Sequence, residues 1–393
     1  MEENISNIEE YRKKRKKKKR LKRLLTVLVI LILLAAIAVT AWFFTRSGQS
    51  GGNIDTGDTA SIDTGIEANG YPIAVGGSSP LDIQQCGKSI FLLTENSLVA
   101  FNDKGKEVYN AHHGYSNPVM TVSSKRVLTY DQGGYQLRVD SNKSKMGSKE
   151  LSEKIVFGAV SDAGYAAVVT QTERYTIRLT VYDAAMQEIL NWSVSDQVIT
   201  GIDFNDKSSA CVVSTYSVEN GKAGAVVYEL DFKADQPERF QTKLEDCMPL
   251  SASYKSDGNI GIVTDRKAFV LDSKGSIREE WEYTGELTSF DNYSDAGMLI
   301  FLADAGDTGN TLAWLIDSDG KRSATGDMDS KVIDSCLTDE RVLVLMEKQL
   351  LIFDRKLEQK KADSLDGVPL RVVGSDHSAY VLTAGELLQI SIS

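Results

Sequence analysis

Histidine, the side chain most often used for general base catalysis and for metal binding, occurs only three times, as His112, His113 and His377. No two histidines have the spacing of a metal-binding pair, and the adjacent His112 and His113 would point to opposite faces of a strand. The sequence also lacks a Gly-x-Ser-x-Gly elbow and a phosphate-binding Gly-x-x-x-x-Gly-Lys loop. We therefore expect no metal site, no cofactor and no catalytic residue set.

Carboxylates are abundant, with 55 Asp and Glu residues, so no single pair can be assigned to glycoside hydrolysis. Asp203, Asp291 and Asp334 share a place near the end of a short apolar run. In an enzyme they could form a charged ring. We expect them to be solvated strand ends, because isolated Asp residues are mostly exposed.

The four cysteines, Cys86, Cys211, Cys247 and Cys336, have no Cys-x-x-Cys spacing. Cys211 and Cys247 are the nearest in sequence and could pair outside the cytoplasm. Three of the four lie in or at the end of apolar runs, and we expect free, buried thiols. Trp192, Trp281 and Trp314 are similarly expected to pack between structural units rather than to bind a ligand.

The element that repeats along the chain is a set of short apolar runs separated by Asp/Gly/Ser turns. It is clearest in residues 256–285, where period-two alternation predicts antiparallel strands joined by hairpins. The end of the third run recurs with a mean spacing near 41 residues, at Asn102, Asp140, Asp183, Asp231, Asp272, Asp317, Asp354 and Ser391. This period predicts an all-β fold, a β-propeller of about eight four-stranded blades, with seven possible because two copies are weak.

The two ends of the repeat region predict how the ring closes. The last copy stops after its third strand, and residues 71–75 supply a spare strand before the first copy. Used as the fourth strand of the final blade, this segment would hide two open sheet edges.

Residues 71–393 resemble the quinoprotein-like and WD40-like propellers. The segments from Asp272 to Trp281 and from Asp183 to Trp192 resemble fragments of the tryptophan-docking motif of quinoproteins, but most copies lack its Gly and Trp. The resemblance therefore implies the architecture and no quinone cofactor. The whole layout is similar to an uncharacterised family of membrane-anchored propellers of low-GC Gram-positive bacteria, which implies a cell-surface location and no known activity.

The first 46 residues differ in charge from the rest. They hold 12 Lys and Arg against 4 Asp and Glu, a net +8, whereas residues 47–393 hold 32 against 51, a net −19. Such an acidic body does not suit nucleic-acid binding. Residues 24–44 carry no charge and span about 31 Å as a helix, the thickness of a membrane core.

Residues 1–23 include eleven basic residues among positions 12–23, which predicts a cytoplasmic N-terminus and a single-pass anchor over residues 24–44. The alternative is a cleaved signal peptide, but the apolar run exceeds the usual 7–15 residues. Residues 45–70, rich in Gly, Ser, Asp and Thr, predict a flexible tether, and residues 71–393 an extracellular propeller.

Three copies are longer than the mean, and in each the extra residues fall between the second and third strands. These loops, at residues 170–175, 215–224 and 303–310, would emerge on one face, and such insertions often mark a binding face. Neutral surface drift is the alternative. The candidate binding residues are Arg174, Tyr175, Tyr216, Glu219, Asn220, Asp304, Asp307 and Asn310.

The combined features predict a non-enzymatic binding scaffold held at the cell envelope. Its partner would be an envelope protein, a peptide or a wall glycan, and it would not bind nucleic acid. The alternative is an extracytoplasmic enzyme on a propeller, either a quinone-dependent dehydrogenase or a hydrolase.

Overall fold

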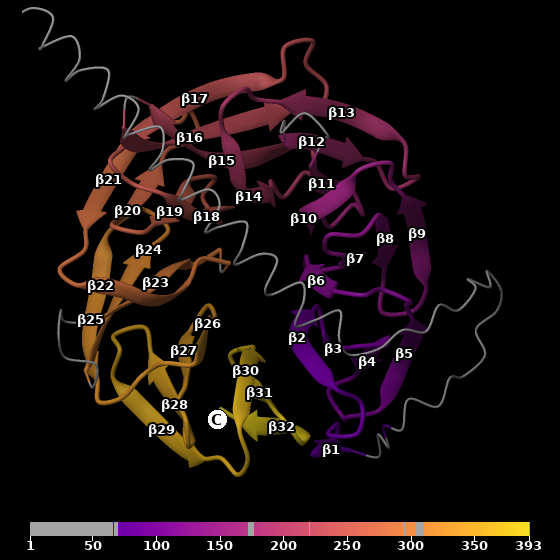
Figure 1. The fold of residues 1–393 in the computed structure, drawn as a ribbon. Helices are drawn as coiled ribbons and strands as arrows, with labels where there is room; N and C mark the ends of the chain where they lie inside the picture. The colour runs from indigo at the N-terminus through magenta and orange to yellow at the C-terminus, as the bar shows by residue number, and fades with distance from the viewer. Residues whose placement is uncertain are drawn as a thin grey trace, which may run out of the picture. The chain divides into compact units, whose positions relative to one another are not determined.

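Each repeat predicted from the sequence folds into a four-stranded antiparallel sheet. The computed structural model describes residues 66, 70–171, 177–219, 221–293, 295–303 and 310–392, and they belong to one compact unit over residues 59–393. Eight such sheets surround a central axis as the blades of a propeller (Figure 1). The predicted β-propeller is confirmed, with eight blades rather than seven.

Within each of the first four blades, the strands follow the chain from the axis outwards. Blade 1 comprises β2 (Pro80–Cys86), β3 (Ser89–Thr94), β4 (Ser97–Phe101) and β5 (Glu107–His112). Blade 2 comprises β6 (Pro118–Val122), β7 (Val127–Asp131), β8 (Gln136–Asp140) and β9 (Lys145–Glu150). Blade 3 comprises β10 (Lys154–Val160), β11 (Ala166–Gln171), β12 (Ile177–Tyr182) and β13 (Glu188–Ser193). Blade 4 comprises β14 (Val198–Phe204), β15 (Ala210–Glu219), β16 (Lys222–Asp231) and β17 (Glu238–Glu245).

The next three blades repeat this order, and the last one borrows a strand. Blade 5 comprises β18 (Pro249–Tyr254), β19 (Ile260–Thr264), β20 (Lys267–Leu271) and β21 (Ile277–Glu282). Blade 6 comprises β22 (Glu286–Asp291), β23 (Gly297–Ala303), β24 (Thr311–Asp317) and β25 (Arg322–Met328). Blade 7 comprises β26 (Asp334–Leu337), β27 (Arg341–Leu345), β28 (Gln349–Asp354) and β29 (Gln359–Ser364). Blade 8 comprises β30 (Pro369–Gly374), β31 (Ser378–Thr383), β32 (Glu386–Ser391) and, as its outermost strand, β1 (Ile73–Ala74).

Strand β1 closes the ring in the way that the sequence predicts. Ile73 pairs with Leu387, and the amides of Val75 and Gly76 both donate to the Gly385 carbonyl. Ile73 and Val75 are 0% and 1% exposed. Hydrogen bonds and buried apolar side chains thereby fix the first strand of the propeller to the last blade. Figure 1 shows β1 next to β32.

All eight predicted turn positions lie at the end of the third strand of a blade or directly after it. The Asp272 carboxylate shows why this residue type recurs there, because its Oδ1 accepts hydrogen bonds from the amides of Lys274 and Ser276 at 2.8 and 2.9 Å. Asn102, Asp183 and Asp354 close their turns with the same pair of hydrogen bonds. The repeated Asp or Asn is therefore a turn-forming residue.

The propeller has two faces, set by the alternation of strand direction. The turn face carries the connections from first to second and from third to fourth strands. The hairpin face carries the connections from second to third strands and the links between blades. These two names are used below.

The hydrophobic core is divided among the interfaces between blades. In the described residues, eight buried apolar clusters each combine side chains of two adjacent blades, one cluster at every interface around the ring. The middle strands are buried on both sides, as in β3, where all six residues are buried. A single blade therefore cannot bury its own apolar residues, which is why the repeat demands neighbours.

Two tryptophans on outermost strands contact the following blade. The Trp281 indole donates to the Gly320 carbonyl at 2.8 Å, and the Trp192 indole donates to the Glu238 carboxylate at 2.9 Å. The guanidinium of Arg322 lies 4.8 Å from the centre of the Trp281 ring and 4.6 Å from that of Trp314. The predicted packing role of these side chains is confirmed.

On the turn face, a large side chain of one blade packs against a glycine of the adjacent blade. Gly275, with a φ of 82°, leaves room for Phe240 of the preceding blade, since a Cβ at position 275 would lie 2.6 Å from the Phe240 Cγ. In blade 3 the order is reversed. Met186 occupies the turn with a φ of 59°, and the preceding blade supplies Gly147, where a Cβ would lie 2.9 Å from the Met186 Cγ. Leu357 and Gly326 repeat this reversed arrangement.

The four cysteines are free, as expected, and Cys336 is the least buried of them. The predicted segments 1–23 and 24–44, and the tether over residues 45–70 except Ile66 and Gly70, lie outside the described residues. Among the residues that the structure describes, no helix is long and apolar enough to cross a membrane.

Candidate functional site

The hairpin face exposes apolar side chains near the central axis. Five of them lie at the start of inner strands, either directly before the strand or at its first or second residue. Their exposed fractions range from 36% to 64%, and they come from blades 1, 4, 5, 7 and 8. We call this set the apolar collar: Leu81, Val198, Met248, Ile333 and Val368.

Proline helps to place the collar. Pro80, Pro249 and Pro369 are the first residues of β2, β18 and β30, and each is adjacent to a collar residue in sequence. Proline at the first position of a strand fixes its φ angle and donates no hydrogen bond, so it suits a strand that begins at an edge. The neighbouring apolar side chain is exposed at the start of the inner strand instead of packing in the core.

Two further apolar residues extend this surface outwards, Tyr135 between β7 and β8 and Val218 near the tip of β15, exposed by 42% and 60%. Seven of the eleven exposed large apolar residues in the described part of the chain therefore lie on the hairpin face. The other four are Val108, Met146 and Ile277 on outermost strands and Tyr293 in an inner turn. Such a concentration on one face is typical of an interaction surface.

The strand ends that flank the three predicted binding loops lie on this same face, and one of the predicted loops has a different structure from the one expected. Residues 215–224 are not a loop, because β15 and β16 continue as a paired hairpin from Ala210 to Asp231, with Glu219 opposite Lys222. Tyr216 lies within this pairing, opposite both Ala225 and Val198. The extra residues lengthen two strands, since strand pairing satisfies their backbone groups better than an open loop.

Of the other predicted residues, Asn310 is exposed directly before β24 on the hairpin face. Arg174, Tyr175, Asn220, Asp304 and Asp307 lie outside the described residues. The candidate set therefore has Tyr216, Glu219 and Asn310 placed on the backbone, while the apolar collar was not predicted. For three of its five members the signal was present in the sequence as an apolar residue next to a proline at a strand start.

The three aspartates considered as a catalytic ring do not form one. Asp203 and Asp291 lie near the turn-face ends of β14 and β22, opposite Val212 and Leu299, whereas Asp334 begins β26 and lies opposite Leu345. Asp203 and Asp291 are therefore the next-to-last and last residues of their inner strands, whereas Asp334 is the first residue of its own.

These carboxylates are also not solvated strand ends, because each accepts a hydrogen bond from the inner strand of the next blade. Asp203 accepts from the Tyr254 amide at 2.9 Å, Asp291 from the Leu337 amide at 2.7 Å, and Asp334 from the Val372 amide at 2.9 Å. The expectation of solvation was wrong because an inner strand is an edge strand with unpaired amides, and these carboxylates satisfy them.

Burial raises the pKa of both Asp203 and Asp291, and it raises the pKa of Asp334 to about 6, against which the Val372 amide acts. The three carboxylates therefore link neighbouring blades through hydrogen bonds. Their oxygens are engaged with protein donors and are poorly placed for acid–base chemistry on a substrate.

Lys255 is a further buried charge at the same end of the inner strands as Asp203. Only 4% of it is exposed, and its ammonium donates to the Asn292 carbonyl at 2.8 Å. Burial lowers the pKa of Lys255 to about 8, opposed by the Asp291 and Asp203 carboxylates. Asn292 in turn donates to Ser251 and to the Gly261 carbonyl, so this group joins blades 5 and 6.

His113 is buried and stacks on Tyr115, and burial lowers its pKa to about 4. It is therefore neutral at physiological pH. His112 and His377 are exposed and lie far apart in the sequence. No group of three or more His, Cys, Asp or Glu side chains suited to a metal ion occurs among the described residues.

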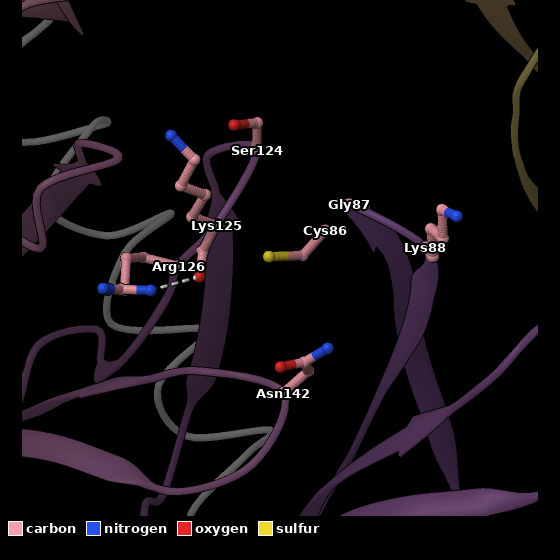
Figure 2. Close-up of a pocket in the computed structure, with 7 residues that line it drawn as sticks. All are labelled: Cys86, Gly87, Lys88, Ser124, Lys125, Arg126 and Asn142. Carbon is pink, nitrogen blue, oxygen red and sulfur yellow. Dashed lines mark hydrogen bonds between the residues drawn. The ribbon is translucent and has the colours of Figure 1, made fainter.

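A cavity of about 200 Å³ opens on the turn face between blades 1 and 2. Figure 2 shows the Cys86 thiol directed into it, with the Lys125 and Arg126 backbone opposite and the Asn142 amide nearby. Burial raises the pKa of the Cys86 thiol to about 11, so the thiol is protonated and a poor nucleophile at neutral pH. Lys88, Ser124 and Gly87 complete the lining.

Solved structures with similar architecture are propellers of low sequence identity. BamB from Moraxella catarrhalis shares 10% identity over 79% of this chain and 96% of that structure, with a TM-score of 0.51. Sqt1 from Saccharomyces cerevisiae shares 12% identity over 84% and 98%, with a TM-score of 0.56. The C-terminal WD40 domain of Sif2 shares 11% over 80% and 94%, with a TM-score of 0.57. At these identities the likeness shows the fold alone.

No curated protein matches the sequence. A family model, in contrast, matches residues 75–392, which is almost the entire propeller. The match begins at the residue after β1 and ends one residue after β32. The chain therefore belongs to DUF5711, a family of unknown function whose member here is an eight-bladed, BamB- and WD40-like β-propeller.

Proposed function

We propose that this protein is a non-enzymatic scaffold of the cell envelope that binds a protein partner on its hairpin face. The observation that carries the proposal is the apolar collar, because exposed apolar side chains gathered near the axis on one face have no structural role in an otherwise well-packed propeller. The partner is a protein or peptide that presents apolar side chains to the collar. A wall glycan is the alternative that the experiment below distinguishes.

The collar is large enough to contribute useful affinity but not to bind indiscriminately. Burying a half-exposed aliphatic side chain contributes roughly 1 kcal/mol, so five such residues contribute about 5 kcal/mol. Association itself costs at least about 4 kcal/mol in lost freedom of motion. Polar contacts from the surrounding hairpins must therefore add to the collar, and they would supply the specificity. The extended β15–β16 hairpin and Asn310 are suitably placed for this.

The membrane location is part of the proposal. An uncharged segment at residues 24–44, preceded by eleven basic residues among positions 12–23, supports a single-pass anchor with a cytoplasmic N-terminus and an extracellular propeller. A tether over residues 45–70 would raise the local concentration of the propeller at the membrane surface. Protease cleavage of the propeller in intact wall-free cells tests this placement, and protection until the cells are lysed would contradict it.

The enzyme alternative loses its best candidates. Asp203, Asp291 and Asp334 each accept a hydrogen bond from a backbone amide of a neighbouring blade, and Asp334 begins its inner strand whereas the other two lie near the ends of theirs. Nothing in their geometry supports acid–base chemistry on a bound substrate. A binding role on the hairpin face accounts for the exposed surface without them.

Photo-crosslinking in cells that produce the full chain tests the partner site. A benzophenone amino acid at Val198 or Val368 should give one discrete protein adduct, and the same probe at Ile277 is the matched control because that residue is similarly exposed on an outermost strand. Lysine at two other collar positions should abolish the adduct. An adduct of the same mass from Ile277, or none from the collar, would overturn the proposal, and a carbohydrate adduct would show the partner to be a glycan.

A further inference from the structure

Charge on the turn face is distributed unevenly around the ring. In six blades the turn between the first and second strands contains an aspartate: Asp162, Asp206, Asp257, Asp295, Asp339 and Asp376. In blades 1 and 2 the same turn contains cations instead, Lys88 in one and Lys125 with Arg126 in the other. In this turn, lysine or arginine replaces aspartate only in two adjacent blades.

The outer turns of the same two blades add to the positive charge. Lys104 and Lys106 follow β4, Lys143 follows β8, and Lys145 begins β9, and all four are exposed. We call these residues the basic sector: Lys88, Lys104, Lys106, Lys125, Arg126, Lys143 and Lys145. The carboxylates in these turns are Asp103, Glu107 and Asp140, and Asp140 is engaged by Arg138 at 2.6 Å. The sector therefore remains positive on a body of net charge −19.

The cavity between blades 1 and 2 lies within the basic sector. Its lining includes Lys88, Lys125 and Arg126 and no carboxylate. Lys125 forms an ion pair with Asp162 at 3.4 Å, but its side chain is 66% exposed, and a pair so open to water contributes little. Lys125 can therefore exchange this partner for another anion. The protonated Cys86 thiol and the Asn142 amide add hydrogen-bonding groups without negative charge (Figure 2).

The chain enters the propeller beside this sector. Gly70 and Tyr71 lie against Gly105, in the outer turn of blade 1 between Lys104 and Lys106, and the Tyr71 hydroxyl donates to the Asn102 carbonyl. Strand β1 then runs from the turn face to the hairpin face. The chain therefore enters the propeller at the same face as the positive charge, next to the outer turn of blade 1.

We propose that the basic sector binds the phosphate groups of anionic lipids at the surface of the membrane in which the chain is anchored. This inference rests on the proposed anchor. A flexible tether does not fix the direction in which the propeller faces. The basic sector does, because it draws the turn face to the membrane and directs the apolar collar away from it, towards a partner.

Phosphate is the preferred ligand chemistry for physical reasons. Each lysine or arginine near an anionic bilayer strengthens binding by roughly fivefold, and the effect falls off within a Debye length, so only cations on the facing surface contribute. The cavity has room for one headgroup phosphate, while the surrounding lysines contact its neighbours. A nucleic acid would instead require a longer positive track than two blades provide, next to six blades that carry aspartates.

Amine footprinting of the full chain reconstituted in vesicles tests the proposal. Acetylation of Lys104, Lys106, Lys143 and Lys145 should be at least about fivefold slower in phosphatidylglycerol vesicles than in phosphatidylcholine vesicles. Lys274 and Lys321, which occupy the equivalent outer turns of blades 5 and 6 and are also exposed, are the matched controls and should not change. High salt should remove the difference.

Substituting all four of residues 104, 106, 143 and 145 with glutamate should abolish the protection of Lys88 and Lys125. Because all four side chains are exposed, the substitutions should leave the fold intact. Equal labelling of the sector in both kinds of vesicle would overturn the proposal. Protection of the basic sector by inorganic phosphate in the presence of phosphatidylcholine vesicles would also overturn the proposal, because it would show that the site binds a free anion.

The anchor is tested separately, by flotation of the reconstituted chain with vesicles after an alkaline wash. If the chain is washed off, the proposed anchor has failed. The footprint is then repeated with the chain added to preformed vesicles, where protection in anionic vesicles still supports the basic sector and its absence still refutes it.

Discussion

Gly275 offers a direct test of how neighbouring blades fit together. Replacing it with alanine places a Cβ 2.6 Å from the Phe240 Cγ of the preceding blade, on a backbone with a φ of 82°. Two costs are expected. The left-handed backbone costs an alanine about 1 kcal/mol, and forcing a methyl group against a packed ring costs about 1–3 kcal/mol. Gly275→Ala should therefore destabilise the propeller by about 2–4 kcal/mol.

A second glycine of the same blade separates the two costs. Gly258 has a φ of 80°, and a Cβ there would meet no atom within 4 Å. Gly258→Ala should therefore show only the backbone cost, about 1 kcal/mol. The difference between the two alanine variants isolates the contact with Phe240.

The same contact should appear as coupling in a double-mutant cycle. Phe240→Ala alone loses the packing of a half-buried ring, but in combination with Gly275→Ala it also removes the clash. The double variant should therefore be more stable than the sum of the single effects predicts, by about 1–3 kcal/mol. Urea unfolding followed by tryptophan fluorescence and circular dichroism measures all four proteins. Additivity within about 0.5 kcal/mol would refute the proposed fit.

Three further outcomes are expected. Deleting the chain through residue 75 removes the buried Ile73 and Val75 and should lower the free energy of unfolding by about 4–6 kcal/mol; an unchanged melting temperature would contradict the closure by β1. Burial raises the pKa of Asp334 from 3.8 to about 6, so between these pH values the folded protein binds a proton that the unfolded chain does not. The free energy of unfolding should therefore fall by up to about 3 kcal/mol as the pH rises from 4 to 6. Asp334→Asn should flatten this slope in urea titrations. Burial lowers the pKa of Lys255 from 10.5 to about 8, so between these pH values the unfolded chain binds a proton that the folded protein does not. The free energy of unfolding should therefore rise with pH in this range. A Lys255→Met variant that kept the same rise would show that Lys255 is not its source.

The parts of the fold that follow from local chemistry could be predicted from the sequence. An Asp or Asn that closes a turn through its own carboxylate or amide acts over four residues, so Asn102, Asp183, Asp272 and Asp354 could be recognised without knowing the fold. Their regular spacing then predicted about eight blades, with seven left open until the structure showed eight. The spare strand before blade 1 could be assigned because an open ring would leave two unpaired edges.

Features that depend on a neighbouring blade could not be predicted in the same way. The amide bound by Asp203 belongs to Tyr254, in the next blade along the chain, and nothing near either residue in sequence links the two. Residues 215–224 were interpreted as a loop because they exceed the mean period, although the extra residues simply lengthen a hairpin. The apolar collar was missed for a related reason. Its members occur singly in the sequence, and only the circular arrangement of the blades brings them together near the axis on the hairpin face.

The collar and the basic sector occupy opposite faces of the propeller, and this separation has a functional consequence. A rigid disc cannot present both surfaces to one flat partner, so the basic sector and the collar must engage different molecules. The chain enters at the face that carries the basic sector, and it passes through β1 before it reaches the face that carries the collar. Variants of the two surfaces should therefore act independently. Collar lysines should leave the lipid footprint intact, and basic-sector glutamates should leave the collar intact but no longer hold it away from the membrane.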